Sequence, residues 1–365
     1  MLSLSQIYPM QKVFLESHNI KNPFFGFGQF NYHLIKGLYQ CAPEDFKMVL
    51  HLKDKDKWRG SFGDFFDYKK YYSLRRYPQA RTRKKYDLWH AMNQNTKIEP
   101  YYDLPYLLTV HNITHIKNKD RYMENETHQR FQSKLSRSSA ITYISEYAKT
   151  STHQYFKVPE VPEYVIYNGN PITSIQVSDS YTPTIRPRAP FLFSIGEFTP
   201  RKNFLSLVKM LRLLPDYQLV IAGKNTTKNA DEIRQYIAQH HLEDRVILPG
   251  KISELDKQWY LKHCRAFVFP SLREGFGLPV IEAMRFGKAV ITSNNTSLPE
   301  VGGAIAYYFD HYDPEYMAQK VNDSIQDFDA NIESNTSKSI ARAQSFNWTT
   351  AAQSYIEVYR TLLNP

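Results

Sequence analysis

Ser271-Leu-Arg-Glu-Gly-Phe-Gly-Leu-Pro-Val-Ile-Glu-Ala-Met284 is the stretch of sequence that decides the predicted fold. It follows the continuous apolar run Ala266-Phe-Val-Phe-Pro270, which is typical of a strand buried in a parallel sheet. A glycine turn over Glu274–Gly277 comes next, and Pro279 stands where the first turn of a helix tolerates proline. The stretch therefore predicts a strand, a glycine turn and a helix N-terminus, where backbone N–H groups and the helix dipole favour an anion.

Two glutamates bracket this predicted anion site. Glu274 lies in the turn, and Glu282 lies one turn into the helix. Carboxylates are poor phosphate ligands, so beside an anion site we expect them to accept hydrogen bonds from hydroxyl groups. An anion cradle flanked by hydroxyl acceptors indicates a sugar nucleotide.

The spacing Glu274-x7-Glu282 inside E-G-F-G-L-P-x-x-E-A-M resembles the signature of retaining glycosyltransferases of the GT-B fold. Within that fold the resemblance is to family 4, the group 1 type, and to mannosyltransferases in particular. It implies that Glu274 holds hydroxyls of the donor sugar and that Glu282 holds the ribose of the nucleotide. It further implies that the donor's sugar hydroxyls and phosphate meet the loop formed by Gly275, Phe276, Gly277 and Leu278.

Cationic residues follow the expected strand Phe191–Gly196, which ends in a glycine included in the predicted donor site. Arg201 and Lys202 are adjacent at a strand-to-helix junction, where the helix dipole repels cations. They suit the charge of a diphosphate leaving group, since Arg can grip it bidentately and Lys acts as a point charge. The segment resembles the family's G-R-x-x-x-x-K-N diphosphate site. The same resemblance places Lys251 and Ile252 beside the nucleotide base.

Two features of the N-terminal half also resemble the family. A glycine loop is expected over Pro23–Gln29, and its Gly28 would approach the donor diphosphate. The family usually has adjacent glycines there, whereas this chain has Gly26-Phe27-Gly28. A strand over Leu104–Asn112 ends at His111, which the resemblance places against the donor sugar near the reaction centre. Asn112 replaces the family's usual aspartate.

Strands alternate with helices at short intervals along the chain, which predicts doubly wound parallel sheets and the α/β class. The resemblance implies a GT-B architecture, in which two Rossmann-like domains face a central cleft. We expect an acceptor-binding domain over residues 1–175 and a linker rich in Ser, Thr and Pro over 176–190. A nucleotide-sugar domain follows over 191–345, and a helix over 346–365 packs back on the first domain.

Length and composition are consistent with two globular domains. The chain has 365 residues, 42% of them hydrophobic, and no run approaches 18 uninterrupted apolar residues. The first residues lack the charged start and apolar core of a secretory signal. Cys41 and Cys264 match no metal or redox spacing, which favours a reduced, cytoplasmic setting.

Positive charge is concentrated in the N-terminal half. Residues 1–175 hold 25 Lys and Arg against 16 Asp and Glu, so they carry most of the net charge of +10. Between Lys69 and Lys85 the cations are interleaved with tyrosines, a mixture that suits an anionic membrane surface. A solvated basic loop is the alternative, and no nucleic acid partner is expected because no nucleic-acid-binding motif accompanies the charge. We therefore expect a cytoplasmic protein, peripheral on the inner face of the membrane.

The sequence thus predicts a retaining hexosyltransferase of class EC 2.4. The donor would be GDP-mannose or a UDP-sugar, and the acceptor a glycan or lipid-linked sugar of envelope polysaccharide synthesis. No metal or other cofactor is expected, because no D-x-D-like pair stands at a suitable strand end and Arg201 with Lys202 would replace the cation. The alternatives are a nucleotide-sugar epimerase, a noncatalytic sugar-nucleotide sensor and a basic nucleic-acid-binding protein.

Overall fold

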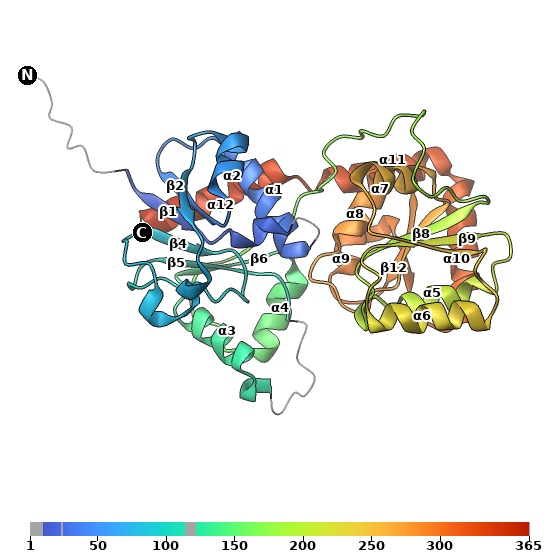
Figure 1. Cartoon of the computed structure of the whole chain (residues 1–365), viewed down its shortest axis with the longest axis horizontal. Helices are drawn as coiled ribbons and strands as arrows, with labels where there is room; N and C mark the ends of the chain where they lie inside the picture. The colour runs from blue at the N-terminus through green and yellow to red at the C-terminus, as the bar shows by residue number, and fades with distance from the viewer. Residues whose placement is uncertain (1–9, 23–24, 114–121, 365) are drawn as a thin grey trace, which may run out of the picture. The chain divides into compact units, whose positions relative to one another are not determined.

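Parallel pairing of apolar strands builds two sheets in the computed structural model, which describes residues 10–22, 25–113 and 122–364. Each sheet belongs to a separate unit of the chain (Figure 1). Unit 1 comprises Met1–Gly169 and Asn347–Pro365, and unit 2 comprises Asn170–Phe346. The predicted class, α/β with doubly wound parallel sheets, is confirmed.

Unit 1 contains a parallel sheet with the strand order β3-β2-β1-β4-β5-β6-β7. Its strands are β1 (Lys12–Leu15), β2 (Lys47–Leu52), β3 (Asp67–Lys70), β4 (Leu88–Ala91), β5 (Tyr106–Val110), β6 (Ala140–Tyr143) and β7 (Glu163–Val165). Its helices are α1 (Gly26–Cys41), α2 (Lys55–Phe62), α3 (Glu126–Ser136), α4 (Glu146–Tyr155) and α12 (Trp348–Leu363), with short 3-10 helices η1 (His18–Lys21), η2 (Ser73–Arg76), η3 (Pro78–Ala80) and η4 (Tyr122–Glu124).

Unit 2 contains a parallel sheet with the strand order β10-β9-β8-β11-β12-β13. Its strands are β8 (Phe191–Ile195), β9 (Gln218–Ala222), β10 (Val246–Gly250), β11 (Ala266–Phe269), β12 (Ala289–Ser293) and β13 (Tyr307–Phe309). Its helices are α5 (Phe204–Leu211), α6 (Lys228–Gln239), α7 (Glu254–His263), α8 (Leu278–Met284), α9 (Leu298–Gly302), α10 (Pro314–Ala330) and α11 (Ile332–Gln344), with η5 (Pro200–Lys202) and η6 (Gly303–Ile305).

Both sheets reverse their strand order at one point, between β1 and β4 in unit 1 and between β8 and β11 in unit 2. At such a switch point the crossovers from two neighbouring strands leave toward opposite faces of the sheet. The carboxyl ends of those strands then border a crevice, which is where doubly wound sheets bind their ligands. The topology therefore indicates where in each unit a site should lie.

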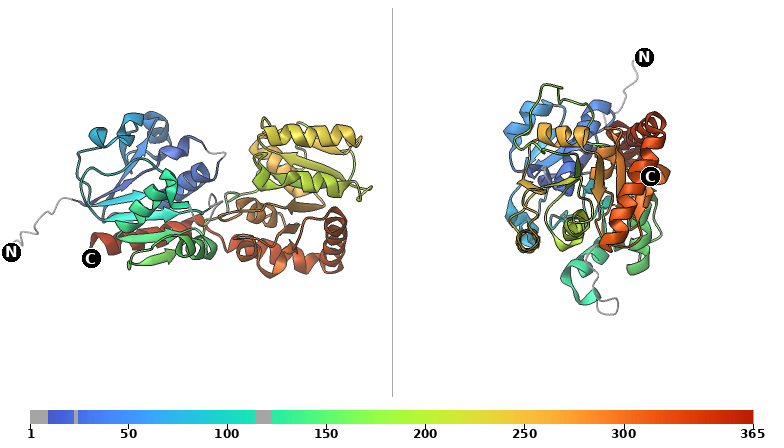
Figure 2. Two further views of the ribbon diagram at one scale, coloured as in Figure 1. Left: turned by 90° about the horizontal axis from the view of Figure 1, so that it is seen from below. Right: turned by 90° about the vertical axis from the view of Figure 1, so that its right-hand side faces the viewer.

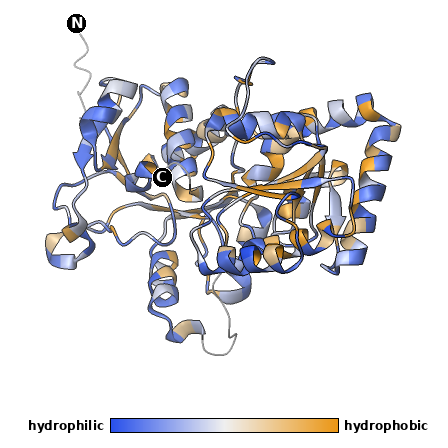
Figure 3. Cartoon of the chain, turned by 45° about the vertical axis from the view of Figure 1, so that its right-hand side comes forward, coloured by the Kyte–Doolittle hydropathy of each residue, from blue (hydrophilic) through white to orange (hydrophobic). Residues whose placement is uncertain are grey.

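Burial on both faces explains why the strands read as continuous apolar runs. Every residue of β5, β9, β11 and β12 is buried. In unit 2, helices α5, α6 and α10 cover one face of the sheet, and α7, α8 and α11 lie on the other (Figure 1). Figure 3 shows the strands as predominantly hydrophobic ribbons, whereas hydrophobic and hydrophilic residues alternate along the helices.

The C-terminal helix α12 packs along α1 within unit 1 (Figure 2). Gly37 permits the close approach, because a Cβ at this position would lie 2.6 Å from the carbonyl oxygen of Trp348. Tyr359 Oη lies 2.8 Å from His90 Nδ1 in β4, and Tyr355 Oη lies 3.3 Å from Thr109 Oγ1 in β5. The last helix of the chain therefore also satisfies polar groups buried in the sheet of unit 1.

The structure differs from the expected linker over residues 176–190. The chain divides between Gly169 and Asn170, and the segment 176–190 belongs to unit 2. The N–H groups of Gln176 and Val177 donate to Gln258 Oε1 at 2.7 and 3.3 Å, and Thr184 donates to Asp256 from both its N–H and its hydroxyl. The segment has a composition typical of a flexible linker, but hydrogen bonds to α7 hold it in place.

The glycine loop expected over Pro23–Gln29 is also wrong in its described part. Pro23 and Phe24 lie outside the described residues, and α1 begins at Gly26, so Gly28 is helical. A Cβ on Gly28 would lie 1.9 Å from the carbonyl oxygen of Asn22. Here glycine serves the close packing of the first turn of α1 against the end of η1, rather than a turn conformation.

No helix within the described ranges combines the length and the apolar character needed to cross a membrane.

Candidate active site

Polar side chains gather at the switch point of unit 2, beyond the carboxyl ends of β8, β11 and β12. Strand β8 leads into Gly196 and η5, β11 leads into the loop Ser271–Gly277, and β12 leads into Asn294–Ser297. The loops come from three neighbouring strands whose parallel order fixes their carboxyl ends at one edge of the sheet. The sequence stretch that starts at Ser271 thus lies where a ligand is expected.

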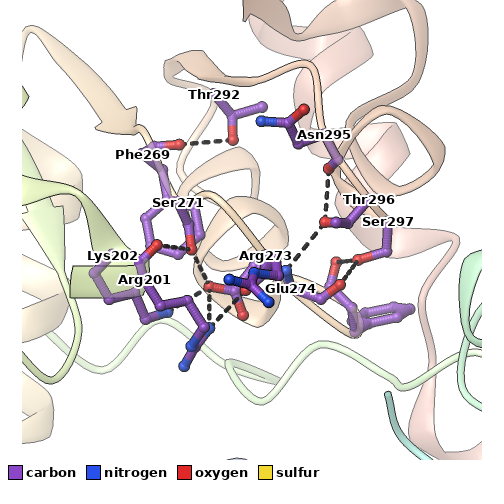
Figure 4. A network of polar contacts seen from close by, with 11 residues as sticks. Arg201, Lys202, Phe269, Ser271, Arg273, Glu274, Thr292, Asn295, Thr296 and Ser297 are labelled. Carbon is purple, nitrogen blue, oxygen red and sulfur yellow. Dashed lines mark hydrogen bonds and ion pairs between the residues drawn. The ribbon is translucent and has the colours of Figure 1, made fainter. Parts of the chain in front are cut away.

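The carboxylate of Glu274 is the centre of this group (Figure 4). Its Oε1 accepts hydrogen bonds from Arg201 Nη1 at 2.9 Å, Lys202 Nζ at 2.6 Å and Ser271 Oγ at 2.6 Å. The structure thus brings together three residues that sequence analysis assigned to the site, and adds Ser271. Within the described residues, the second carboxylate oxygen of Glu274 makes no hydrogen bond. One oxygen therefore fixes the two cations, and the other remains available to a ligand.

The ion cluster is held out of water. Glu274 and Lys202 side chains are 12% and 9% exposed, whereas the Arg201 side chain is 39% exposed. Burial raises the pKa of Glu274, but the charges of Lys202 and Arg201 and the hydrogen bonds outweigh it and leave the pKa below its ordinary value. Burial lowers the pKa of Lys202, Arg201 adds to this, and Glu274 opposes it. The cluster therefore pairs an ionised carboxylate with two cations, of which Arg201 faces solvent.

Backbone contacts fix η5 against the loop after β11. Arg201 Nη1 also donates to the carbonyl oxygen of Arg273 at 2.7 Å, and the N–H of Leu272 donates to the carbonyl oxygen of Arg201 at 2.8 Å. The ammonium group of Lys202 lies 4.6 Å from the ring centroid of Phe269, and a Cβ on Gly196 would be 3.1 Å from Lys202 Cε. Glycine at position 196 therefore gives the Lys202 side chain room to reach Glu274.

Two hydroxyl residues after β12 hold the glycine turn in place. Thr296 Oγ1 accepts from the N–H of Glu274 at 3.0 Å, and Ser297 Oγ lies 3.1 and 3.0 Å from the carbonyl oxygens of Glu274 and Phe276 (Figure 4). Gly277 has a φ of 105°, which L side chains rarely adopt, and α8 begins at Leu278 directly after it. The predicted donor-binding loop is therefore fixed from outside by residues that sequence analysis did not select.

Glu282 lies in α8 and is buried, with 7% of its surface exposed. Its Oε1 accepts from Lys257 Nζ at 2.9 Å, and Lys257 also lies 2.9 Å from Glu254. Burial lowers the pKa of Lys257, but the two glutamates outweigh it and raise the pKa above its ordinary value. Sequence analysis missed Lys257, whose only local signal is its place one turn after Glu254 in α7.

The other residues predicted at the nucleotide base follow β10. Lys251 is exposed and Ile252 is half-buried, directly after Gly250. The N–H of Gly223 at the end of β9 donates to the carbonyl oxygen of Gly250 at 2.7 Å. Lys251 and Ile252 therefore follow the carboxyl end of β10, and their place beside a nucleotide base stays a prediction.

His111 and Gly28 belong to unit 1. His111 follows β5, is 5% exposed, and lies with its Nε2 2.9 Å from the carbonyl oxygen of Met92. Since a carbonyl only accepts, Nε2 carries the proton. Burial lowers the pKa of His111 to about 4, so the ring is neutral near pH 7. Phe27 and Phe30 of α1 contact this ring edge-on, at 4.8 and 4.6 Å between centroids.

Comparison with known proteins agrees with this arrangement. Residues 182–339 match the family described as glycosyl transferases group 1. The chain is 26% identical to O-antigen chain mannosyltransferase B of Escherichia coli, over 96% of this chain and all of that protein. It is 28% identical to the serotype-specific mannosyltransferase WbdA of Escherichia coli, over 69% of this chain and 33% of that protein. The structure of HepE from Anabaena in complex with UDP and glucose is similar in fold, with a TM-score of 0.73 at 18% identity, over 97% of this chain and all of that one.

Proposed function

We propose that the chain is a glycosyltransferase of the GT-B fold that moves a hexose from a nucleoside diphosphate sugar to an acceptor hydroxyl. The match of residues 182–339 to the group 1 glycosyl transferases and the similarity to an O-antigen mannosyltransferase support this proposal. The acceptor is a glycan or lipid-linked sugar of envelope polysaccharide synthesis, as the name of the O-antigen relative suggests. The anomeric configuration of the hexose is retained. GDP-mannose and UDP-sugars are the proposed donors.

The cluster of Arg201, Lys202 and Glu274 at the switch point of unit 2 carries this proposal. Cleavage of the bond between sugar and diphosphate leaves negative charge on the phosphates and oxocarbenium-like positive charge on the sugar. Arg201 has guanidinium nitrogens beyond the one bound to Glu274, and its side chain is 39% exposed. Fixed cations in a partly dry site stabilise the departing diphosphate without having to reorganise.

The two glutamates then have different tasks. Glu274 is anchored through Oε1 by both cations, so its other oxygen is positioned to accept a sugar hydroxyl. Glu282 is anchored by Lys257 and is proposed to accept from the ribose hydroxyls. The backbone between Phe276 and Leu278, fixed by Ser297, meets the sugar and the phosphate. We assign no covalent nucleophile. The acceptor hydroxyl attacks the anomeric carbon from the same face of the sugar that the diphosphate leaves, and the leaving phosphate takes the proton of that hydroxyl.

No metal takes part in the proposed reaction, because Arg201 and Lys202 supply the positive charge. This is tested directly by assaying transfer after treatment with EDTA, which is expected to leave the rate unchanged. Loss of transfer on chelation, with recovery on adding Mg²⁺ or Mn²⁺, would contradict the metal-free reaction. We further propose that the protein works at the cytoplasmic face of the membrane, where nucleotide sugars are available.

The first experiment is a thermal-shift screen of the purified protein with UDP-, GDP-, ADP- and dTDP-sugars. A ligand that binds the native state raises its melting temperature by mass action. We expect one nucleotide series to raise it, and a radiolabelled donor of that series to give either transfer to acceptor or slow hydrolysis. A shift without turnover would favour a sugar-nucleotide sensor, and release of a free altered sugar would favour an epimerase.

A further inference from the structure

A basic pocket of about 370 Å³ lies in unit 1, apart from the residues assigned so far. Its volume falls in the range of about 300–1,000 Å³ typical of small-molecule sites. Three segments form it: the region from η2 to Arg81, the segment after β4, and one face of α3. Its lining residues are Arg76, Tyr77, Arg81, Lys97, Glu99, Arg130, Ser133, Lys134 and Arg137, six of them cationic and one anionic.

Helix α3 presents a continuous stripe to this pocket. Arg130, Ser133 and Lys134 line it together with Arg137, just past the end of the helix, a spacing of three, four and seven residues that puts them on one face. Like charges at this spacing destabilise a helix, so a basic stripe is unfavourable unless something opposes it. The stripe faces a cavity rather than open solvent, which brings its charges closer to those of the other two segments.

The floor of the pocket is a buried ion cluster in which two cations share one carboxylate. Lys134 is 2% exposed, donates to the carbonyl oxygens of Gln94 and Thr96, and lies 3.4 Å from Glu99 Oε1 in an ion pair without hydrogen-bond geometry. Arg137 pairs with the other oxygen of Glu99, and its guanidinium lies 4.1 Å from the ring centroid of Tyr106. One carboxylate thus serves both floor cations.

The cations of the walls and rim have no carboxylate partner among the described residues. Arg81 and Arg130 are half-buried, and Arg76 and Lys97 are exposed at the rim. Among the described residues, no carboxylate lies within ion-pair distance of these four side chains. Arg81 Nε is buried without a hydrogen-bond partner in the described part of the chain, as is Arg137 Nε. A buried donor without a partner is costly, and an anion in the pocket would supply one.

We propose that this pocket binds a phosphate or diphosphate ester, which on the proposed function is the phosphorylated end of the acceptor. Several guanidinium groups around one cavity suit the bidentate recognition of phosphate oxygens. This inference makes the proposed function more specific, because it identifies the chemical class of the acceptor as a phosphate ester.

A smaller, adjoining pocket indicates that the ligand is a phosphate ester rather than a free phosphate ion. It has a volume of about 190 Å³ and shares Arg76 and Lys97 with the basic pocket. Its remaining lining is uncharged or aromatic and includes Asn93, whose side-chain nitrogen is buried without a partner among the described residues. Asn93 follows β4 and His18 follows β1, so this pocket opens at the switch point of unit 1. Amide and aromatic side chains suit sugar hydroxyls and ring faces beside the phosphate.

The test is calorimetric titration of the full chain with inorganic pyrophosphate. The Arg201→Gln background removes one of the two cations proposed to contact the diphosphate at the donor site, and both variants are compared in it. Arg81→Gln is compared with Arg83→Gln, a matched change two residues away that removes the same charge from an exposed side chain outside the pocket. We expect Arg81→Gln to weaken pyrophosphate binding about tenfold or more and Arg83→Gln to weaken it less than twofold. Equal weakening by both variants, or no binding before substitution, would overturn the proposal.

Farnesyl diphosphate separates the two sources of the phosphate. Leu74, near the rim and outside the pocket lining, is 66% exposed. If the ester is lipid-linked, Leu74→Ala weakens the binding of farnesyl diphosphate and leaves that of pyrophosphate unchanged. If the phosphate belongs to a water-soluble ester, Leu74→Ala affects the binding of neither. Circular dichroism confirms that each variant is folded.

The pocket and the proposed function can fail separately. The donor screen depends on unit 2, and the Arg81→Gln variant should give the same donor-induced thermal shift as the unsubstituted chain. If the protein binds pyrophosphate through Arg81 but binds no donor, the pocket proposal stands and the transferase proposal is rejected. If the protein turns over a donor but Arg81→Gln does not change pyrophosphate binding, the transferase proposal stands and the pocket proposal is rejected.

Discussion

At the scale of single residues, the candidate site works by giving each glutamate a cationic anchor. Glu274 is anchored by Arg201 and Lys202, and Glu282 by Lys257. A buried carboxylate without a partner destabilises the fold, so the anchors hold both groups in position, and the cations keep the pKa of Glu274 below its ordinary value. Each remaining carboxylate oxygen can then accept a hydroxyl without the residue having to move.

Glu282→Gln is expected to weaken binding of the donor nucleotide by about tenfold to a hundredfold, since a hydrogen bond to a charged group contributes about 1.5–3 kcal/mol. Calorimetric titration with the donor found in the screen measures the change. Glu254→Gln is the matched control, because it removes the other carboxylate that contacts Lys257, on a side chain that is 53% exposed. Equal affinities in the two variants would contradict the ribose role.

At the scale of elements, the glycine turn between β11 and α8 gains its shape from the next crossover. The hydroxyls of Thr296 and Ser297, which follow β12, contact three backbone groups of the turn. Neighbouring parallel strands end at the same edge, so the loop after one strand can support the loop after the other. The glycine turn of the candidate site is therefore held in place by hydrogen bonds from outside the turn.

Ser297→Ala is expected to lower the free energy of unfolding by about 1–3 kcal/mol and to weaken donor binding, because the carbonyl groups of Glu274 and Phe276 lose the hydroxyl donor that they share. Ser293→Ala is the control: its hydroxyl is buried without a partner in the described residues, so its removal should be nearly neutral. Urea unfolding and donor titration measure both effects. If the Ser297 variant binds the donor as tightly as the Ser293 variant does, the glycine turn keeps its conformation without the Ser297 hydroxyl.

The contact of α1 with α12 predicts a second element-scale effect. Gly37→Ala is expected to destabilise unit 1 by about 1–3 kcal/mol, because its Cβ would press on the backbone of Trp348 and force the helices apart. Gly26→Ala, at the start of the same helix, meets nothing within 4 Å and is expected to be neutral or stabilising by up to about 1 kcal/mol. Urea unfolding of both variants gives the comparison, and equal stabilities would contradict the close packing.

At the scale of the whole molecule, the two units share one strand order but differ in what lies at their switch points. Unit 2 has an ion cluster on a fixed turn, whereas unit 1 has a polar pocket that adjoins six cations. Part of the net positive charge of the N-terminal half thus lies around the basic pocket of unit 1. Several basic residues between Lys69 and Lys85 line the pocket or stack on tyrosines, as Arg83 does on Tyr101.

Unit 1 is expected to lose stability as the pH falls from 7 to 5, whereas unit 2 is not. Burial lowers the pKa of His90 to about 3 and that of His111 to about 4, so both contribute stability above pH 6.5 that is lost as the unfolded chain takes up protons. At pH 5 each of these histidines lowers the free energy of unfolding of unit 1 by about 2 kcal/mol relative to its value above pH 6.5. The depressed carboxylate pKa of Glu274 in unit 2 acts only below about 4.5.

Tryptophan fluorescence during urea unfolding measures this difference. Trp58, Trp89 and Trp348 report on unit 1, and Trp259 reports on unit 2, so a Trp259→Phe variant isolates the first transition. At pH 5 the transition of unit 1 should move to lower urea while that of unit 2 stays in place. Transitions that shift together would contradict the assignment of the acid-sensitive groups to unit 1.

The sequence by itself determined the class of the fold, the order of strand, glycine turn and helix, and the edge of the sheet where Arg201, Lys202 and Glu274 meet. These follow from apolar runs, glycine and proline positions and the rule that parallel strands share a carboxyl edge, all of which are local or topological signals.

Only the tertiary structure decided which groups contact one another. The Glu274 partners Arg201 and Lys202 lie 73 and 72 residues away along the chain, and Lys257 lies 25 residues from Glu282. The same is true of the attachment of residues 176–190 to α7, the helical start at Gly26 and the basic pocket of unit 1. Strand register and helix packing set these distances, and no local pattern of side chains encodes them.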